Sequence, residues 1–459
     1  MHNERSVNDR PTPGTPRHYQ FPLVHRHQTA NGISIIVAVV TRVPLATVQY
    51  VIDGGARYEP IDHSGTAQLT AKALAEGTEQ LSGDDLAERF ELLGCSVEPD
   101  TGWEALDLRS TVISSQLADT ITLAGEVLTA PAFRDDDVAR LRDERLSELL
   151  QRDAEPRGLA DDAFSRVAYG PDSRLHFPIG GERETVLTFT PSRAREWHKH
   201  VVRPGRLAVI VAGDVQPESV FRAVERTLGG WKVPNGMADK PPNESGPSRT
   251  GMQFVAKAEA AQSEIRIGHT GPPRGHQDYY ALTVLNAILG GLFGSRINLN
   301  LREAHGYTYG AFSGFEWRRD GSTFCVSTAV RSDATVPAIK EIRGEIERIR
   351  DQPVSATELS LALEHLEGVF PIRFETTGAL TNALATQHIF GLAATYFDEY
   401  RDRIRAVSAG EVQRVAQAHL RPRDLRTVIV GNVMLREELT ALAEGELAVI
   451  EDSLSSTST

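Results

Sequence analysis

The sequence predicts an α+β protein that contains two tandem copies of one domain. A helix, an Arg-Pro step, a β-branched apolar run and a glycine turn follow one another at residues 192–215, and the same series returns at residues 410–433. Such internal self-similarity is typical of a duplicated domain. In both halves strands come first, followed by helices, further strands and long amphipathic helices. This order predicts helices packed on one face of a sheet, with the whole arrangement present twice.

Apolar runs locate the strands of the two copies. The first half has such runs at residues 33–40 and 47–52, and the second half has one at residues 263–269. In the repeated series Pro204 and Pro422 end the preceding helices, because proline lacks the amide N–H and clashes with the turn before it. The apolar run after each proline predicts a strand that is buried on both faces.

A long helix is predicted to begin at Asp135. Three consecutive aspartates at residues 135–137 suit a helix N-terminus, where acidic side chains satisfy free amides and meet the positive end of the helix dipole. Val138, Leu141 and Leu149 follow at helical spacing and are expected to face the core.

A polar, proline-containing stretch separates the two halves. Residues 231–251 include Pro234, Pro241, Pro242 and Pro247, and this composition is typical of a linker. Both chain ends are polar and are expected to be disordered. The predicted organisation is an N-terminal tail at residues 1–22, a first domain at 23–233, a linker at 234–251, a second domain at 252–448 and a C-terminal tail at 449–459.

The composition argues against several classes of function. With 49 basic and 62 acidic side chains the net charge is −13 and no lysine or arginine run stands out, so a nucleic-acid partner is not expected. No run of 18 apolar residues is present, so no membrane span is expected. The first residues lack the apolar core of a secretory signal. A cytoplasmic location is therefore expected, or a periplasmic one if the start is misassigned.

The cysteines and histidines form no spaced metal-binding pattern. Cys95 and Cys325 lie in different halves and are expected to be buried core residues. Four histidines are expected to be ordinary polar or capping residues: His63, His198, His200 and His305.

Three short segments of the first half carry a specific motif. They are residues 53–59 (DGGARYE), 65–72 (GTAQLTAK) and 76–78 (EGT). Together they resemble the first catalytic segment of the M16 family, the zinc peptidases that include pitrilysin, insulinase and the mitochondrial processing peptidase. In that family the inverted motif H-x-x-E-H supplies two histidine ligands one helical turn apart and a glutamate that takes a proton from the zinc-bound water. The five motif positions here read Gln68-Leu69-Thr70-Ala71-Lys72.

These substitutions remove the chemistry of the motif. Gln68 and Lys72 keep the i, i+4 spacing and face the same side of the predicted helix, but an amide is a poor zinc ligand and an ammonium group repels the cation. Ala71 cannot carry a proton. Glu148 matches the place of the family's third ligand on a later helix, and its alternative role is an ion pair with Lys72 or Arg145. The resemblance therefore implies that this chain holds no zinc at the degenerate motif and no other cofactor.

The second half carries another segment of the same resemblance. Residues 289–309 (LGGLFGSRINLNLREAHGYTY) are similar to the M16 pattern G-G-x-x-S-R-L followed by L-R-E-x-x-G-x-x-Y. In relatives the arginine and tyrosine reach an active site across the closed molecule, where they bind the substrate backbone and stabilise the oxyanion. The resemblance assigns these roles to Arg302 and Tyr309, and substrate binding also to Gly290 and Gly291.

The same residues also have structural alternatives. Arg302 could form a salt bridge with Glu303 or Asp320, and Tyr309 could be a strand aromatic with its hydroxyl at the rim. The Gly290-Gly291 pair could serve any helix end.

The resemblance covers residues 25–445 and implies a fold and a function. The expected fold is two tandem α/β rolls, each an antiparallel-rich sheet covered by helices, which together make half of a clamshell. The expected function is that of a non-peptidase subunit, inactive alone, which supplies Arg302 and Tyr309 in trans to a zinc-bearing M16 partner that cleaves peptides or unfolded segments. Two alternatives remain open: a purely structural M16 homologue, and a protein that captures extended peptides at a sheet edge without cleaving them.

Overall fold

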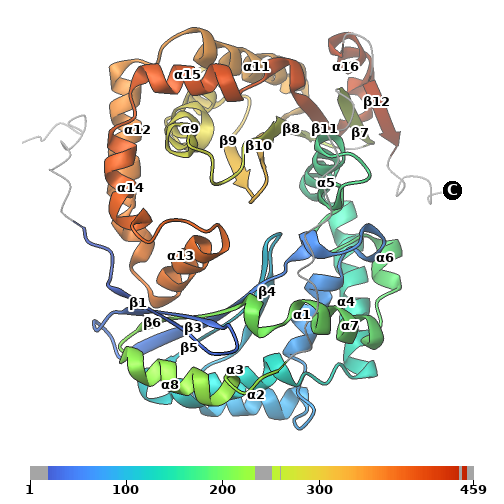
Figure 1. Ribbon diagram of the computed structural model, residues 1–459. Coiled ribbons are helices and arrows are strands. Elements are labelled where there is room, and N and C mark those ends of the chain that lie inside the picture. Colours follow the sequence, from blue (N-terminus) through green and yellow to red (C-terminus); the bar gives the residue numbers. More distant parts are fainter. Residues whose placement is uncertain (1–18, 233–250, 259, 444–446, 452–459) are drawn as a thin grey trace, which may run out of the picture.

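Each half of the chain forms one six-stranded mixed sheet (Figure 1). The computed structural model describes residues 19–232, 251–258, 260–443 and 447–451. The strands of the first sheet are β1 (Val24–Gln28), β2 (Ser34–Val39), β3 (Leu45–Asp53), β4 (Glu98–Thr101), β5 (Ala105–Ile113) and β6 (Leu207–Gly213). Those of the second are β7 (Met252–Lys257), β8 (Gln262–Gly271), β9 (Ala311–Trp317), β10 (Ser322–Arg331), β11 (Arg426–Asn432) and β12 (Leu447–Glu451).

Helices and strands alternate along the chain in a similar order in both halves. The first half contains α1 (Thr66–Leu74), α2 (Gly83–Leu92), α3 (Leu117–Thr129), α4 (Asp135–Ala154), α5 (Pro156–Ala168), α6 (Arg183–Leu187), α7 (Pro191–Val201) and α8 (Pro217–Leu228). The second contains α9 (Tyr279–Asn286), α10 (Arg296–Asn298), α11 (Thr335–Asp351), α12 (Ala356–Val369), α13 (Thr377–Ile389), α14 (Tyr396–Arg405), α15 (Ala409–His419) and α16 (Arg436–Leu442).

The strand orders show the duplication directly. The first sheet runs β1-β2-β6-β3-β5-β4 and the second runs β12-β7-β11-β8-β10-β9. The pair β2–β6 is parallel, as is its counterpart β7–β11, whereas β3 and β8 pair antiparallel with their neighbours. The predicted α+β duplication, with antiparallel-rich sheets, is therefore confirmed.

The repeated series folds as the sequence predicts. Helices α7 and α15 end just before the Arg-Pro steps, a short 3-10 turn follows each, and strands β6 and β11 come next. Every residue of β6 is buried, as expected for a strand that is covered on both faces. The helix predicted from Asp135 is α4, and its Val138, Leu141 and Leu149 are buried.

Each half lends one helix to the sheet of the other half (Figure 1). Helix α5 of the first half packs on β8 and β11, where Phe164 joins a buried cluster with Val255 and Val428. Helix α13 of the second half packs on β3 and β6, and its Leu380 shares a core with Ile210. The expectation of helices on one sheet face is therefore incomplete, because each sheet is also covered by a helix of the opposite half.

Ion pairs also join the halves. Arg319 donates to both carboxylate oxygens of Asp53 at 2.9 Å. Arg57, which is almost fully buried, donates to Glu104 at 2.8 Å and also pairs with Asp320 of the second half. A buried guanidinium held by two carboxylates fixes the two halves in one relative position.

The predicted tails are wrong at their inner ends. Phe21 is buried in the second half, where its ring lies 4.3 Å from that of Phe397 and stacks on it. Residues 449–451 lie in β12, which pairs in parallel with β7. Aromatic packing and a strand edge thus order segments that polar composition alone assigns to tails. Residues 1–18, 452–459 and 233–250, which hold the rest of both tails and most of the linker, lie outside the described residues.

One segment, Tyr279–Ala304, is long and apolar enough by composition to cross a membrane. Its residues Leu282, Leu285 and Leu289 are buried in the core of the second half. Core packing therefore accounts for its apolar composition.

Candidate functional site

Helix α1 places the degenerate zinc motif, and a buried ion pair fixes the start of that helix. Glu59 accepts hydrogen bonds from the backbone N–H groups of Gly65 and Ala67, at the first turn of α1. Arg174 binds the same carboxylate through Nε at 2.8 Å and Nη2 at 2.6 Å, and both side chains are buried. Because a buried carboxylate is stable only with such partners, this arrangement keeps α1 in one position.

One motif position on α1, Lys72, takes part in ion pairs with α4 that leave a net positive charge. Lys72 Nζ lies 3.1 Å from Glu148 Oε1, and Arg145 Nη1 lies 2.9 Å from Glu148 Oε2. Burial alone would raise the pKa of Glu148, but the hydrogen bonds and charges of Arg145 and Lys72 outweigh burial and hold the pKa below its ordinary value. The structure thus shows the ion pair that was the alternative role for Glu148.

The other two motif positions, Gln68 and Ala71, supply neither a good zinc ligand nor a general base. Ala71 is buried and carries no proton-accepting group. The Oε1 atom of Gln68 is buried and has no hydrogen-bond partner among the described residues. A zinc ion here would meet one amide, one ammonium group and a carboxylate already shared by two cations. Two positive side chains repel the ion, so these residues do not fit the zinc of the peptidase motif.

The glycine pair of the second half has a packing role. Gly290 and Gly291 end a π-helical turn at Ala287–Gly291. A Cβ atom on Gly290 would lie 2.5 Å from the hydroxyl oxygen of Ser313, and one on Gly291 would lie 2.7 Å from the amide nitrogen of Asn286. Both contacts are too short for a side chain, so glycine is needed here to bring this turn against β9. Substrate binding by these two residues stays a prediction.

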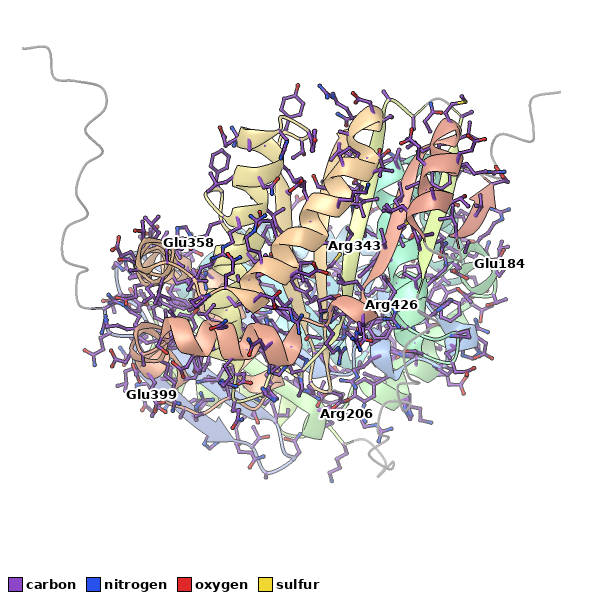
Figure 2. All side chains as sticks on the ribbon, turned by 90° about the horizontal axis from the view of Figure 1, so that it is seen from above. Glu184, Arg206, Arg343, Glu358, Glu399 and Arg426 are labelled. Carbon is purple, nitrogen blue, oxygen red and sulfur yellow. The ribbon has the colours of Figure 1, made fainter. Side chains whose placement is uncertain are left out.

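Arg296 of the same motif also has a structural role. It forms a bidentate pair with Glu358, which at the same time caps the N-terminus of α12 at Ser355. Glu358 lies on the outer surface of the second half (Figure 2). Burial would raise the pKa of Glu358, but Arg296 and the cap hold it down at about 2.

Arg302 is held at the surface with part of its hydrogen-bonding capacity unused. Its guanidinium lies 4.1 Å from the ring centre of Phe293, and its Nε atom lies 3.6 Å from Glu303. The Nη1 atom is buried and, within the described residues, has no hydrogen-bond partner. The contact with Glu303 is long and weak. The alternative salt bridge with Asp320 is wrong, because Asp320 binds Arg57.

The side chain of Tyr309 is almost completely exposed to solvent. It lies in the loop before β9, which begins at Ala311, so the alternative of a strand aromatic is wrong. Its side chain is 93% exposed, and no hydrogen bond to its hydroxyl is found in the described parts of the chain. An exposed tyrosine hydroxyl can donate a hydrogen bond to a carbonyl or an oxyanion that another molecule brings.

The structure does not bring the two motifs together within this chain. No hydrogen bond or ion pair joins Gln68, Lys72 or Glu148 to Arg302 or Tyr309 among the described residues. The degenerate motif and the Arg302–Tyr309 pair are thus two separate sites.

The cysteines and three of the histidines have structural environments. Cys95 and Cys325 pack against core clusters, as expected, although each is only partly buried. His198 Nε2 lies 2.8 Å from the carbonyl oxygen of Leu128, and burial lowers the pKa of this imidazole. His305 stacks on Tyr307, and His63 lies beside Asp62.

One group of titratable residues was missed by the sequence reasoning. His276, Asp278 and His419 come together between the start of α9 and the end of α15. The only local signal is the His-Gln-Asp series at residues 276–278, and the third member is far away in the sequence.

The duplicated fold and the altered motif together define a protein with the frame of a zinc peptidase and without its metal ligands. Residues 36–173 match the insulinase family (peptidase family M16), and residues 188–366 match the peptidase M16 inactive domain. The chain belongs to the M16 peptidase family.

Some similar proteins are described as zinc proteases and another as a non-peptidase homologue. An uncharacterised zinc protease of Streptomyces coelicolor is 25% identical over 414 residues, which cover 88% of this chain and 89% of the relative. A non-peptidase homologue of Helicobacter pylori is 22% identical over 414 residues, covering 89% of this chain and 94% of the relative. At such identities the overall match does not decide between the two descriptions. The residues at positions 68, 71 and 72 favour the second.

Solved structures share the fold. The peptidase M16 inactive domain from Pseudomonas fluorescens superposes with a TM-score of 0.83 at 20% identity and covers 89% of this chain and 98% of its own. A protease from Helicobacter pylori superposes with a TM-score of 0.84 at 19% identity, covering 90% of this chain and 100% of its own. The M16 fold predicted from the motifs is confirmed.

Proposed function

We propose that this chain is the non-peptidase subunit of a heterodimeric M16 endopeptidase and lacks the catalytic zinc at its degenerate motif. Its partner is an M16 chain with an intact H-x-x-E-H motif that binds the catalytic zinc. This chain supplies Arg302 and Tyr309 across the closed interface, and the substrates are peptides or unfolded segments.

The observation that carries the proposal is the contrast between the two motifs. The zinc positions are filled by the Lys72–Glu148–Arg145 ion pairs, whereas Arg302 retains an unused buried N–H and Tyr309 stands fully exposed. The exposed Tyr309 hydroxyl and the exposed part of the Arg302 side chain could contact a substrate that is bound in an opposing subunit.

The chemistry expected of these residues is limited to binding and charge stabilisation. The Arg302 guanidinium can bind a substrate carbonyl, and the Tyr309 hydroxyl can donate one hydrogen bond to the oxyanion of the tetrahedral intermediate. Activation of the water and general-base catalysis would belong to the partner.

Assembly gives the first test. Co-expression with a neighbouring M16 gene that encodes H-x-x-E-H, followed by size-exclusion chromatography with light scattering, should yield a heterodimer with pseudo-two-fold symmetry. Peptide cleavage should appear only in the pair. A stable homodimer that ignores the partner at micromolar concentration would contradict the proposal, since it would pair two sites without zinc.

A further inference from the structure

The cluster of His276, Asp278 and His419 has the composition of a transition-metal site. One potential ligand atom from each residue lies within 4.8 Å of the other two. Two imidazoles and one carboxylate are a donor set that zinc-class ions accept. This cluster lies in the second half, between the N-terminal end of α9 and the C-terminal end of α15, and is separate from the degenerate motif on α1 of the first half.

The present distances bracket those of a metal site. His419 Nε2 lies 2.7 Å from Asp278 Oδ2, and His276 Nδ1 lies 3.8 Å from the same oxygen. In a tetrahedral site with ligands about 2.0–2.2 Å from zinc, the ligand atoms lie roughly 3.3–3.6 Å apart. One distance must therefore lengthen and the other shorten by only a few tenths of an ångström to about 0.9 Å. Side-chain rotation alone provides changes of this size.

The ligand atoms are now engaged in hydrogen bonds that a metal would replace. His276 Nδ1 accepts the backbone N–H of Asp278 at 3.1 Å, so its one lone pair would have to leave this amide to bind a metal. Arg414 and His419 both contact the carboxylate of Asp278, which is the anionic ligand of the three. His419 needs only the tautomer with the proton on Nδ1 to offer its Nε2 lone pair to a metal.

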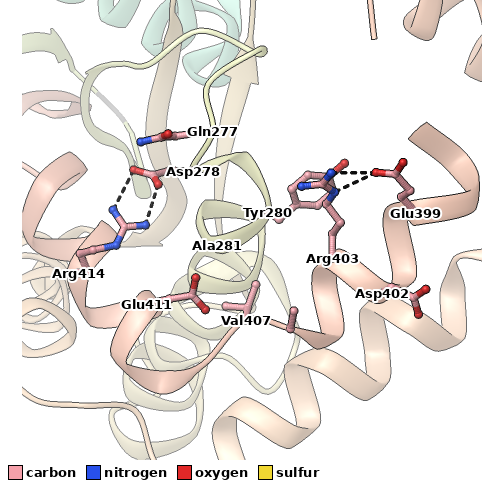
Figure 3. Close-up of a pocket in the computed structure, with 11 residues that line it drawn as sticks. Gln277, Asp278, Tyr280, Ala281, Glu399, Asp402, Arg403, Val407, Glu411 and Arg414 are labelled. Atoms are coloured by element: carbon pink, nitrogen blue, oxygen red, sulfur yellow. Dashed lines mark hydrogen bonds and ion pairs between the residues drawn. The ribbon is translucent and has the colours of Figure 1, made fainter. Parts of the chain in front are cut away.

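Arg414 is the present partner of the carboxylate, and its geometry leaves one oxygen for a metal. Its Nη2 atom donates to Asp278 Oδ1 at 2.7 Å, and the bond from Nη1 to Oδ2 is longer, at 3.2 Å (Figure 3). Both histidines approach Oδ2. A metal on Oδ2 would therefore break the longer Arg414 bond and replace the contact between His419 Nε2 and Oδ2. The Oδ1 bond would remain as the outer partner that fixes a metal-bound carboxylate.

One member of the cluster, Asp278, lies in the wall of a pocket with a volume of about 670 Å³ (Figure 3). The two histidines do not line this pocket. The charged residues of the wall are Asp278, Glu399, Asp402, Glu411, Arg403 and Arg414. Four carboxylates against two guanidinium groups leave a negative balance, which concentrates cations in the pocket.

We propose that His276, Asp278 and His419 bind a divalent transition-metal ion, with zinc as the expected ion. The site is structural: it ties α15 to the start of α9 and performs no step of peptide cleavage. It does not depend on the proposed heterodimer.

The test uses the full chain, freed of metal by chelation and titrated with zinc chloride by calorimetry. We expect one strong site, together with a melting temperature that rises with zinc concentration. His276→Ala and His419→Ala should each weaken zinc binding at least tenfold, because the loss of an outer partner alone typically costs about 10–100-fold. Cobalt(II) in place of zinc should give the visible absorption of a four-coordinate site.

Two controls locate the metal. His63→Ala removes a partly exposed histidine near α1, and Glu148→Gln removes the carboxylate of the degenerate motif. Both should bind zinc as the wild type does, and circular dichroism of every variant establishes that it is folded. The proposal would be overturned if the wild type bound no zinc. It would also be overturned if His276→Ala and His419→Ala bound zinc as strongly as the wild type. The cluster would then be a salt-bridge network without a metal. Loss of zinc in Glu148→Gln would also overturn the proposal.

Discussion

Glu148 keeps the position of a metal ligand and has the partners of a salt bridge. Its carboxylate is shared by Lys72 and Arg145, and the ammonium group of Lys72 stands one helical turn from Gln68, where family members have two histidines. A single substitution at position 72 would therefore not restore the metal site. Ligands, base and local charge would all have to change together to restore it.

Metal content tests this residue-level account. In a chain that carries His276→Ala and His419→Ala, so that the second-half cluster cannot contribute, we expect well below one zinc per chain after dialysis without chelator. The physical reason is the cationic pair beside Glu148. Near one zinc per chain in that background, removed by Glu148→Gln, would show that the degenerate motif still binds metal.

Glu358 gives a prediction on pH. Its folded pKa of about 2 is below its ordinary value of 4.5. The stability from its pairing with Arg296 is therefore fully present above pH 4.5 and is lost as the pH falls towards 2. Urea midpoints measured from pH 5 to pH 2.5 should fall more steeply in the wild type than in Glu358→Gln. Parallel curves would mean that the pair adds nothing to the acid dependence.

At the scale of elements, the exchange of α5 and α13 explains how two sheets become one body. Phe164 of α5 is buried against strands of the second half, close enough to Gly268 that a Cβ there would lie 2.9 Å from the ring. A helix of one half is thus part of the core of the other, and neither sheet has its complete cover without the opposite half.

Phe164→Ala should therefore destabilise the whole chain. Removing a buried phenylalanine typically costs about 3–5 kcal/mol, and the loss should appear in the single unfolding transition of both halves. Leu150→Ala is the matched control, since Leu150 is exposed on α4 and exposed substitutions typically stay within about 0.5 kcal/mol. Denaturant unfolding followed by circular dichroism measures both. A Phe164→Ala chain as stable as the control would show that α5 is a detachable element.

Local pattern predicted some of these elements and missed others. The strand runs, the Arg-Pro repeat and the helix from Asp135 depend on hydrophobic period and on proline and capping chemistry, which the sequence states directly. The helix exchange, the burial of Phe21 and the pairing of Asp320 with Arg57 depend on contacts between distant segments. No local pattern encodes these contacts.

The candidate sites also divide into those that the sequence predicted and those that it missed. Gln68, Ala71 and Lys72 were identified because a motif places them, and the ion pairs of Glu148 followed from charge. The His276–Asp278–His419 cluster was missed because α15 delivers one member from far along the chain. Gly290 and Gly291 have a packing role against Asn286 and Ser313, which local pattern did not predict, and their substrate binding stays a prediction.

For the molecule as a whole, the two motifs lie apart and have opposite states. The zinc motif is closed by its own ion pairs, and the Arg302–Tyr309 pair is open to a partner. In the proposed heterodimer a second subunit would bring a substrate to the exposed Tyr309. The proposed heterodimer follows from that asymmetry, and substitution of the open pair inside the complex tests it most directly.

That measurement is kcat/KM of the reconstituted pair with Arg302→Ala or Tyr309→Phe in this chain, beside Arg331→Ala as an exposed control of the second half. The loss of one oxyanion donor typically costs about 10²–10³ in rate. We therefore expect each of the two variants to lower kcat/KM at least about tenfold, with the melting temperature and the heterodimer unchanged and the control at wild-type activity. Wild-type kinetics in both Arg302→Ala and Tyr309→Phe would contradict the account and leave a purely structural subunit.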